Sequence, residues 1–274
     1  MYLDFFGLKE NPFNVTSDPS FLYLSHTHKE ALNHLIYGID QRKGFITITG
    51  EVGAGKTTLC RALLKKLDER TKTSLIFNSD LPEIQLLEAI VLDFGIAPKR
   101  LSKVTFINQL NVFLLEQLSL GNNAVLIMDE AQNIRSSTLE TIRMLSNLET
   151  EKEKLLQIVL VGQPQLRDKL NSPNLLQLRQ RIGVRFHIRA LSKDEVLGYI
   201  YHRLEVAGDT NNIRFEPRAV DLLYSYSNGI PRVVNIICDK ALLLAFVCET
   251  HTVGENIMRK SIDELEGQFN FVTA

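Results

Sequence analysis

A glycine-rich stretch, ThrIleThrGlyGluValGlyAlaGlyLysThrThrLeu at residues 47–59, carries side chains suited to phosphate chemistry. It fits G-x-x-x-x-G-K-[ST], whose glycines let backbone N–H groups curl inward around phosphates. Lys56 can reach the β- and γ-phosphates of a nucleotide, and Thr57 can place its hydroxyl on Mg²⁺. The pattern predicts a site for a nucleoside triphosphate and Mg²⁺, with these binding residues: Gly50, Glu51, Val52, Gly53, Ala54, Gly55, Lys56, Thr57 and Thr58.

The residues on both sides of this loop support the interpretation. Residues 45–48 are apolar and β-branched, which is typical of a strand, and apolar residues recur at helical spacing over 59–67. A helix that starts at the loop adds the partial positive charge of its N-terminus. The alternative, a glycine-rich turn with an incidental lysine, is disfavoured because both flanks agree with the motif.

An acidic pair follows a second apolar run. Residues 124–128 are continuously apolar, as in a buried parallel strand, and Asp129 and Glu130 come directly after them. Asp129 then falls near the magnesium and the phosphates, and Glu130 can polarise a water for attack on the γ-phosphate. The alternative is that the pair begins a helix. The phosphate loop upstream favours the magnesium and base roles.

Two further polar residues, Gln163 and Arg232, are candidates for contact with the ligand. Gln163 follows an apolar run at 156–161, and the carboxyl ends of strands line the ligand sites of open α/β sheets. A turn amide that satisfies only local backbone is the alternative. Arg232 lies in the first turn of a helix that Gly229 precedes and Pro231 starts. A cation there opposes the helix dipole, so a purely structural role is less natural.

The order of elements predicts two domains. We expect an α/β nucleotide-binding domain over residues 1–190 and an all-helical domain over 191–274, since the pattern becomes purely helical after Leu191. The expected strands are 45–48, 74–78, 124–128, 156–161 and 184–188. The expected helices are 28–41, 59–67, 83–94, 103–120, 136–149, 193–207, 217–227, 231–249 and 253–265.

Two of these segments carry a more specific expectation. The alternating pattern of residues 184–188 predicts a half-exposed strand at the edge of the sheet. Residues 1–28 are rich in aromatics and turn formers, so they either pack against a core or help to wrap an adenine ring. The sequence leaves both readings open.

The composition is that of an ordinary globular protein. The 274 residues are 45% hydrophobic, and the formal net charge of −1 gives no overall basic field that would attract nucleic acid. Three cysteines without metal-ligand spacing (Cys60, Cys238 and Cys248) are expected to be buried thiols. No apolar run reaches the roughly 18–20 residues that cross a bilayer, and the first residues do not form a secretory signal. We therefore expect a cytoplasmic protein.

Together these motifs resemble those of the AAA+ ATPases along nearly the whole chain. The resemblance implies a P-loop fold with a five-stranded parallel sheet in the order 5-1-4-3-2 and a C-terminal helical lid. Gly50–Thr57 would be the Walker A loop and Asp129-Glu130 the Walker B pair. Gln163 would stand at sensor 1, where the superfamily more often has Asn, Thr or Ser, and Arg232 at sensor 2. Arg179 and Arg181 match the region of the arginine finger that acts on a neighbouring subunit, and the sequence does not decide between them.

Within this superfamily, the resemblance is closer to the ATPase domain of the general secretion pathway protein A family and to related pilus-biogenesis ATPases. It rests on MetTyrLeuAspPhePheGlyLeuLysGluAsnProPhe, GlyGluValGlyAlaGlyLysThrThrLeu, MetAspGluAlaGln, ValGlyGlnProGlnLeu and LeuArgGlnArgIle. The resemblance implies a homo-oligomer that works with an envelope secretion or pilus assembly protein. It also allows a place at the inner face of the inner membrane, through a partner or a membrane span beyond this chain.

The resulting hypothesis is Mg²⁺-dependent ATP hydrolysis that drives assembly or remodelling of such a complex. Glu130 would activate water, Gln163 would orient it, and Arg232 would report the γ-phosphate to the lid. ATP is favoured over GTP because the guanine-specific Asn-Lys-x-Asp motif is absent. The alternatives are a DNA-associated ATPase of replication or transposition, and a nucleotide-binding scaffold without turnover.

Overall fold

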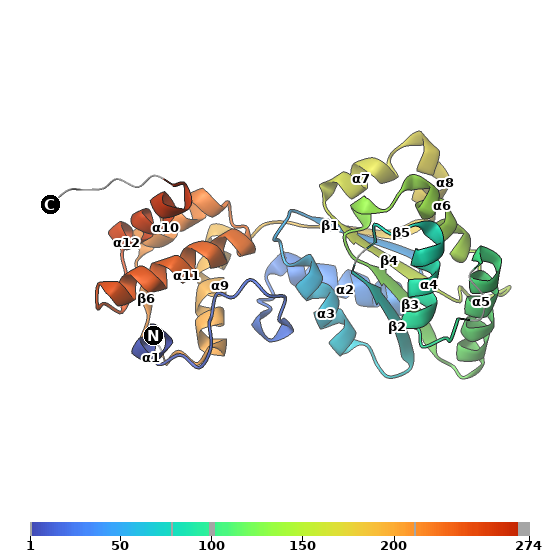
Figure 1. Ribbon diagram of the computed structural model, residues 1–274, viewed down its shortest axis with the longest axis horizontal. Helices are drawn as coiled ribbons and strands as arrows, with labels where there is room; N and C mark the ends of the chain where they lie inside the picture. Colours follow the sequence, from blue (N-terminus) through green and yellow to red (C-terminus); the bar gives the residue numbers. More distant parts are fainter. Residues whose placement is uncertain (1, 78, 99–101, 211, 268–274) are drawn as a thin grey trace. The chain divides into compact units, whose positions relative to one another are not determined.

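The computed structural model describes residues 2–77, 79–98, 102–210 and 212–267, which form two compact units. One, here the sheet unit, comprises residues 26–51 and 59–188. The other, the helical unit, comprises residues 1–25, 52–58 and 189–274. Figure 1 shows the strands of the large sheet gathered in the first and a bundle of helices in the second.

The sheet unit contains five parallel strands in the order β2-β3-β4-β1-β5. Their bounds are Phe45–Gly50 (β1), Thr71–Ile76 (β2), Asn123–Met128 (β3), Gln157–Gly162 (β4) and Ile182–Ile188 (β5). This confirms the expected fold class and strand order. The expected second strand reached residue 78, which lies outside the described residues. The expected edge position of the fifth strand is confirmed as well, since burial alternates along β5 and only β1 pairs with it.

Helices cover both faces of this sheet (Figure 1). They are α2 (His26–Asp40), α3 (Lys56–Lys66), α4 (Glu83–Asp93), α5 (Lys103–Ser119), α6 (Ser136–Leu145), α7 (Pro164–Leu170) and α8 (Leu176–Arg181). Strands β1 and β4 are buried along their whole length, as their continuous apolar runs require. A polar link ties three helices together: Glu83 of α4 accepts hydrogen bonds from Lys103 of α5 and Thr141 of α6. These bonds, that of Lys103 first, hold the pKa of Glu83 below its usual range.

The helical unit contains α1 (Tyr2–Phe6), α9 (Lys193–Val206), α10 (Pro217–Ser227), α11 (Pro231–Val247) and α12 (Glu255–Leu265), with a short pair of strands, β6 (Arg214–Phe215) and β7 (Thr252–Val253). Helix α9 starts with a complete capping box between Ser192 and Glu195. Two of the three cysteines are buried as expected, but Cys248 is exposed. The reason is that α11 ends at Val247, so Cys248 caps the helix instead of facing its core.

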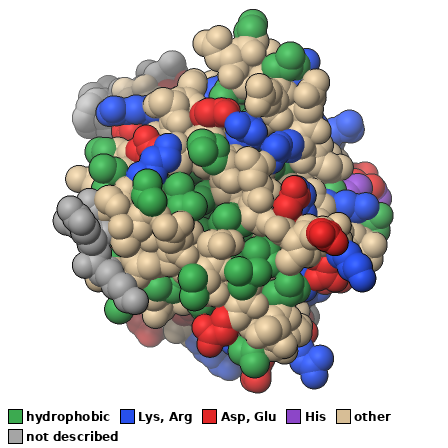
Figure 2. All heavy atoms as spheres, turned by 90° about the vertical axis from the view of Figure 1, so that its right-hand side faces the viewer, with side chains coloured by type: hydrophobic (Ala, Val, Ile, Leu, Met, Phe, Trp, Pro, Cys, Tyr) green, Lys and Arg blue, Asp and Glu red, His purple; other side chains and the backbone are tan. Residues whose placement is uncertain are grey.

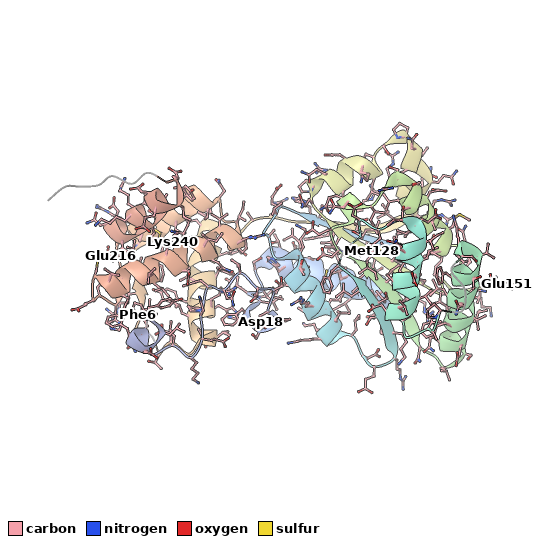
Figure 3. All side chains as sticks on the ribbon, in the orientation of Figure 1. Phe6, Asp18, Met128, Glu151, Glu216 and Lys240 are labelled. Carbon is pink, nitrogen blue, oxygen red and sulfur yellow. The ribbon has the colours of Figure 1, made fainter. Side chains whose placement is uncertain are left out.

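The N-terminal residues group with the helical unit, whereas the sequence analysis assigned them to the nucleotide-binding domain. The physical reason is a shared core: Phe6, Phe13 and Phe21 are buried among the apolar side chains of α9, α10 and α11. Figure 3 shows Phe6 at α1 within this unit. The packing reading of residues 1–28 therefore accounts for their aromatic side chains.

A buried arginine holds this segment in place. Arg203 of α9, only 6% exposed, donates hydrogen bonds to the carbonyls of Pro12 and Asn14, the second at 2.9 Å. Its guanidinium also lies 4.7 Å from the centroid of the Phe21 ring, within cation–π range. Among the described residues, no carboxylate forms an ion pair with it, so carbonyl oxygens and aromatic faces stabilise the charge.

We expect Arg203→Met to lower the free energy of unfolding by about 2–4 kcal/mol, because it keeps the apolar stem but leaves two carbonyls without donors. Urea unfolding followed by circular dichroism measures the change. Arg218→Met is the matched control, because the Arg218 side chain is 84% exposed. Equal stability of the two variants would contradict an anchoring role for Arg203.

Candidate nucleotide site

Three strand ends meet at one edge of the sheet. In the parallel register, Thr49 of β1 lies opposite Gly162 of β4, and Met128 of β3 lies opposite Leu160. The glycine loop follows β1, Asp129 follows β3, and Gln163 follows β4. In Figure 3, Met128 lies inside the sheet unit, where β3 ends. Chain connectivity therefore brings the three predicted motifs to the same edge, where open α/β sheets bind ligands.

The glycine loop has the backbone that its sequence predicts. Gly53 and Gly55 have φ values of +79° and +88°, in the left-handed region that favours glycine. Helix α3 begins at Lys56, so its first N–H groups face the end of the loop. Lys56 is buried, with only 5% of the residue exposed. These features fit triphosphate, and the oxygen donors Thr57 and Asp129 fit Mg²⁺, a hard cation that prefers oxygen.

Residues 52–58 group with the helical unit, and one contact explains why. The backbone N–H of Arg232, the second residue of α11, donates to the carbonyl of Gly53 at 3.2 Å. A Cβ on Gly53 would lie 2.5 Å from the Cβ of Arg232, so only glycine fits at this position. The exposed side chain of Arg232 therefore starts beside the loop.

The turn before Arg232 is equally constrained. Gly229 has a φ of +71°, and a Cβ there would lie 2.0 Å from the carbonyl oxygen of Leu191. The N–H of Leu191 donates to the Gly229 carbonyl at 2.9 Å. This pairing fixes where α11 starts and, with it, where Arg232 stands.

The acidic pair does not begin a capped helix. Asp129 is only 2% exposed, and its Oδ1 accepts a hydrogen bond from the N–H of Glu130 at 2.9 Å. Glu130 has a left-handed φ of 51° and makes no side-chain cap to the short 3-10 turn that follows. This uncommon backbone costs on the order of 1–3 kcal/mol.

Two glutamines hold the Glu130 carboxylate. Gln132 Nε2 donates to Glu130 Oε2 at 2.5 Å, and Gln163 Nε2 donates to the same oxygen at 3.1 Å. Gln132 Oε1 in turn accepts from the backbone N–H of Gln163 at 3.0 Å. A Cβ at position 162 would lie 2.7 Å from Gln132 Oε1, so Gly162 leaves room for this side chain. Gln163 therefore contacts Glu130 itself, and is not satisfied by local backbone alone.

Two residues of this network, Gln132 and Ser79, are not among the site residues predicted from the sequence. Gln132 lies two residues after Glu130 in MetAspGluAlaGln, and its position beside the acidic pair is the signal that could have revealed it. Ser79 Oγ donates to the carbonyls of Asp129 and Glu130 at 2.8 and 3.0 Å. Its signal is its place after β2, next to β3 in the sheet. Both residues fix the turn that carries the predicted base.

The two finger candidates differ in their surroundings. Arg181 Nη1 donates to Ser146 Oγ at 2.7 Å and to Asn147 Oδ1, so this side chain binds the C-terminal end of α6. Arg179 makes no side-chain hydrogen bond or ion pair within the part of the chain that the structure describes. Its backbone carbonyl accepts hydrogen bonds from Arg185 Nη2 at 2.6 Å and from the N–H of Ile182. The structure therefore does not bring either arginine to the Glu130 network of its own subunit.

The fold is the P-loop AAA+ fold, and residues 39–170 match the family described as AAA domain. The chain is 42% identical over 268 residues to General secretion pathway protein A of Aeromonas hydrophila. That match covers 97% of this chain and 49% of the relative, so the chain spans about half of the relative's length.

Solved structures with the same fold come from several proteins. Cdc6p from Pyrobaculum aerophilum has a TM-score of 0.67 at 17% identity, over 89% of this chain and 70% of that one. The ORC2 protein of Aeropyrum pernix has a TM-score of 0.63 at 20% identity, over 86% and 66%. The RuvB Holliday junction branch migration motor of Thermotoga maritima has a TM-score of 0.57 at 17% identity, over 86% and 69%. At these identities the likeness concerns the fold alone.

Within the described ranges, no helix combines the length and the apolarity that spanning a membrane needs. Over the same ranges, no group of three or more His, Cys, Asp or Glu side chains could hold a metal ion.

Proposed function

We propose that this chain hydrolyses ATP with Mg²⁺ and that the cycle assembles or remodels a secretion or pilus complex of the bacterial envelope. The observation that carries the proposal is the Glu130 network at the sheet edge where the glycine loop emerges. The similarity to General secretion pathway protein A supports the choice of envelope machinery.

In the proposed mechanism, the loop N–H groups and Lys56 hold the β- and γ-phosphates. Thr57 and Asp129 hold Mg²⁺, which supplies positive charge that stabilises the phosphate oxygens when bound. Glu130 accepts a proton from the attacking water, and Gln132 and Gln163 orient its carboxylate through the shared Oε2. Arg232 contacts the γ-phosphate and couples it to the helical lid.

The proposed active form is an oligomer in which an arginine of one subunit acts on the nucleotide of its neighbour, since neither Arg179 nor Arg181 bonds the Glu130 network among the described residues. Arg179 is the better candidate for that arginine. Its side chain is not committed to a partner among the described residues, whereas Arg181 binds α6. The domain division is proposed as a P-loop domain and a helical lid that meet near residue 190. A cytoplasmic place at the inner face of the inner membrane belongs to the same proposal.

The first test is the binding of nucleotide. We expect Lys56→Ala to abolish measurable ATP binding, because it removes the cation that pairs with the phosphates while leaving the glycine loop. Titration with a fluorescent ATP analogue measures this, and Lys65→Ala, an exposed lysine of α3, is the matched control. ATP affinity that survives in Lys56→Ala would refute the phosphate-loop assignment.

The second test separates envelope machinery from DNA. We expect duplex DNA to leave the ATPase rate unchanged at every salt concentration of a series. If the chain did bind the phosphates of DNA, any stimulation of the ATPase rate would fall steeply as the salt concentration rises. The face of the molecule in Figure 2 shows basic and acidic side chains interspersed with hydrophobic ones, not a basic stripe. Strong, salt-sensitive stimulation would favour the DNA-associated alternative.

A test in cells addresses the envelope role. In cells that lack the gene, the wild-type chain should restore secretion or piliation, and the Glu130→Gln variant should not.

A further inference from the structure

A cavity of about 220 Å³ opens beside the edge strand β5, on the side of the sheet where α7 lies. All its walls belong to the sheet unit, and none of the residues proposed for the nucleotide site lines it. Its polar lining consists of Thr47, Thr49, Arg167, Asn171, Arg185 and His187. The cavity is large enough to hold a small molecule.

Strand register explains why these side chains share one face. Thr47 lies opposite Arg185, and Thr49 lies opposite His187, in the parallel pairing of β1 with β5. Because side chains alternate along a strand, all four project from the same side of the sheet. Arg167 comes from α7, which covers the neighbouring part of this face. The cavity stays open because β5 is the last strand.

The charges of the lining are one-sided. Two guanidinium groups, Arg167 and Arg185, line the cavity, and no carboxylate does. The nearest carboxylate oxygen to Arg167 is that of Asp168 at 3.9 Å, and both side chains are mostly exposed, so this pair contributes little. Arg185 has no ion pair within the described ranges, and its Nη2 bonds only the Arg179 carbonyl. The planar guanidinium group of arginine binds carboxylate and phosphate groups through two parallel hydrogen bonds.

A buried hydroxyl on the cavity wall lacks a partner. Thr47 is 5% exposed, and its Oγ1 makes no hydrogen bond within the part of the chain that the structure describes. Its neighbour Thr49 is satisfied by His187 Nδ1 at 3.0 Å. A buried hydroxyl left without a partner destabilises the folded chain. A ligand with an acceptor atom would satisfy the Thr47 hydroxyl and the two guanidinium groups together.

We propose that this cavity binds a small anionic molecule through a carboxylate or phosphate group. Arg167 and Arg185 pair with the anion, the Thr47 hydroxyl donates to it, and the apolar side chains of Leu170 and Ile182 contact its body. The binding itself does not depend on the proposed ATPase function.

A regulatory consequence does rest on that function. Because Arg185 also holds the carbonyl of Arg179, an anion on Arg185 acts on the C-terminal end of α8. That end carries the proposed arginine finger.

The test uses the full chain in a Lys56→Ala background, which weakens the phosphate loop as a competing anion site. Succinate and inorganic phosphate are titrated separately by calorimetry, so that the two arms distinguish a carboxylate from a phosphate ligand. We expect saturable binding of at least one probe, with one site per chain. Arg185→Gln and Thr47→Val should each weaken it about tenfold or more, while Arg135→Gln, an exposed arginine that does not line the cavity, should not.

Thr47→Val also guards against misfolding. It keeps the shape and removes the unpartnered hydroxyl, so the melting temperature of the empty protein should stay the same or rise. No saturable binding of either probe would overturn the proposal. Binding that Arg185→Gln and Thr47→Val leave unchanged, or that exists only with an intact Lys56, would overturn it too. Because no turnover is measured, failure here is distinct from failure of the ATPase proposal.

Discussion

Glu130→Gln should bind ATP as tightly as the wild-type chain and hydrolyse it at least about a hundredfold more slowly. General-base catalysis by a positioned carboxylate contributes about 10²–10⁴ in rate, and an amide cannot accept the proton. The substitution keeps the shape and the oxygen that Gln132 and Gln163 contact. Nucleotide titration and steady-state phosphate release on the same preparation measure both quantities.

The matched control is Glu151→Gln. Glu151 is exposed between α6 and β4, and Figure 3 shows it at the periphery of the sheet unit, whereas Met128 lies inside. It should leave both binding and turnover unchanged. Full turnover by Glu130→Gln would remove Glu130 as the base and, with it, the proposed mechanism.

Gln132→Ala gives a graded version of the same experiment. It deletes the closest donor to the Glu130 carboxylate and the acceptor for the Gln163 N–H, but no group that touches phosphate. We expect a lower kcat with an unchanged KM for ATP, because the base loses its orientation while the binding residues stay intact. Gln132→Glu should be worse than Gln132→Ala, since it places a second negative charge beside Glu130. A change in KM alone would show that Gln132 acts on binding and not on Glu130.

Arg179→Ala should reduce the ATPase rate of the assembled protein by about 10³-fold or more, with ATP still bound. An arginine supplied by a neighbour contributes about 10³–10⁵ in related phosphoryl transfer. Arg181→Ala should instead lower stability through its lost bonds to Ser146 and Asn147, with a smaller loss of rate per folded molecule. ATPase assays and thermal unfolding of the two variants separate these effects.

Mixing subunits tests whether the arginine acts on a neighbour. Arg179→Ala keeps its own nucleotide site, and Lys56→Ala keeps its finger but binds no nucleotide. Each is inactive alone, yet mixed oligomers contain complete sites, so activity should return on mixing. If mixing restores nothing for Arg179→Ala but does so for Arg181→Ala, the assignment of the finger is reversed. If neither recovers, a finger in trans is refuted.

The sequence was sufficient where local chemistry and strand order determine position. The strand order and the motif positions at strand ends are confirmed, because glycine loops and buried parallel strands leave clear patterns. The sequence did not predict which side chains meet when they are distant along the chain, because tertiary contacts determine those positions. Gln132 and Gln163 meet at Glu130 only through the pairing of β3 with β4. Likewise, the difference between Arg179 and Arg181 depends on Ser146 and Asn147 at the end of a helix more than 30 residues away.

Residues 1–25 illustrate the same limit on a larger scale. Their aromatic composition predicts that they are buried, but no periodic pattern indicates which part of the chain packs against them. The covering helices begin at Lys193, and Arg203 binds the segment from 189 residues along the chain. Contacts across such separations leave no local signature.

That shared core also sets an order of events during synthesis. Phe6, Phe13 and Phe21 leave the ribosome before the helices that bury them are translated. The sheet unit lies between and can fold while those rings still face water, so they are exposed to chaperones or aggregation. A truncated chain ending near residue 190 would keep this exposure permanently. Expression of the sheet unit alone should therefore begin at residue 26, without the aromatic segment.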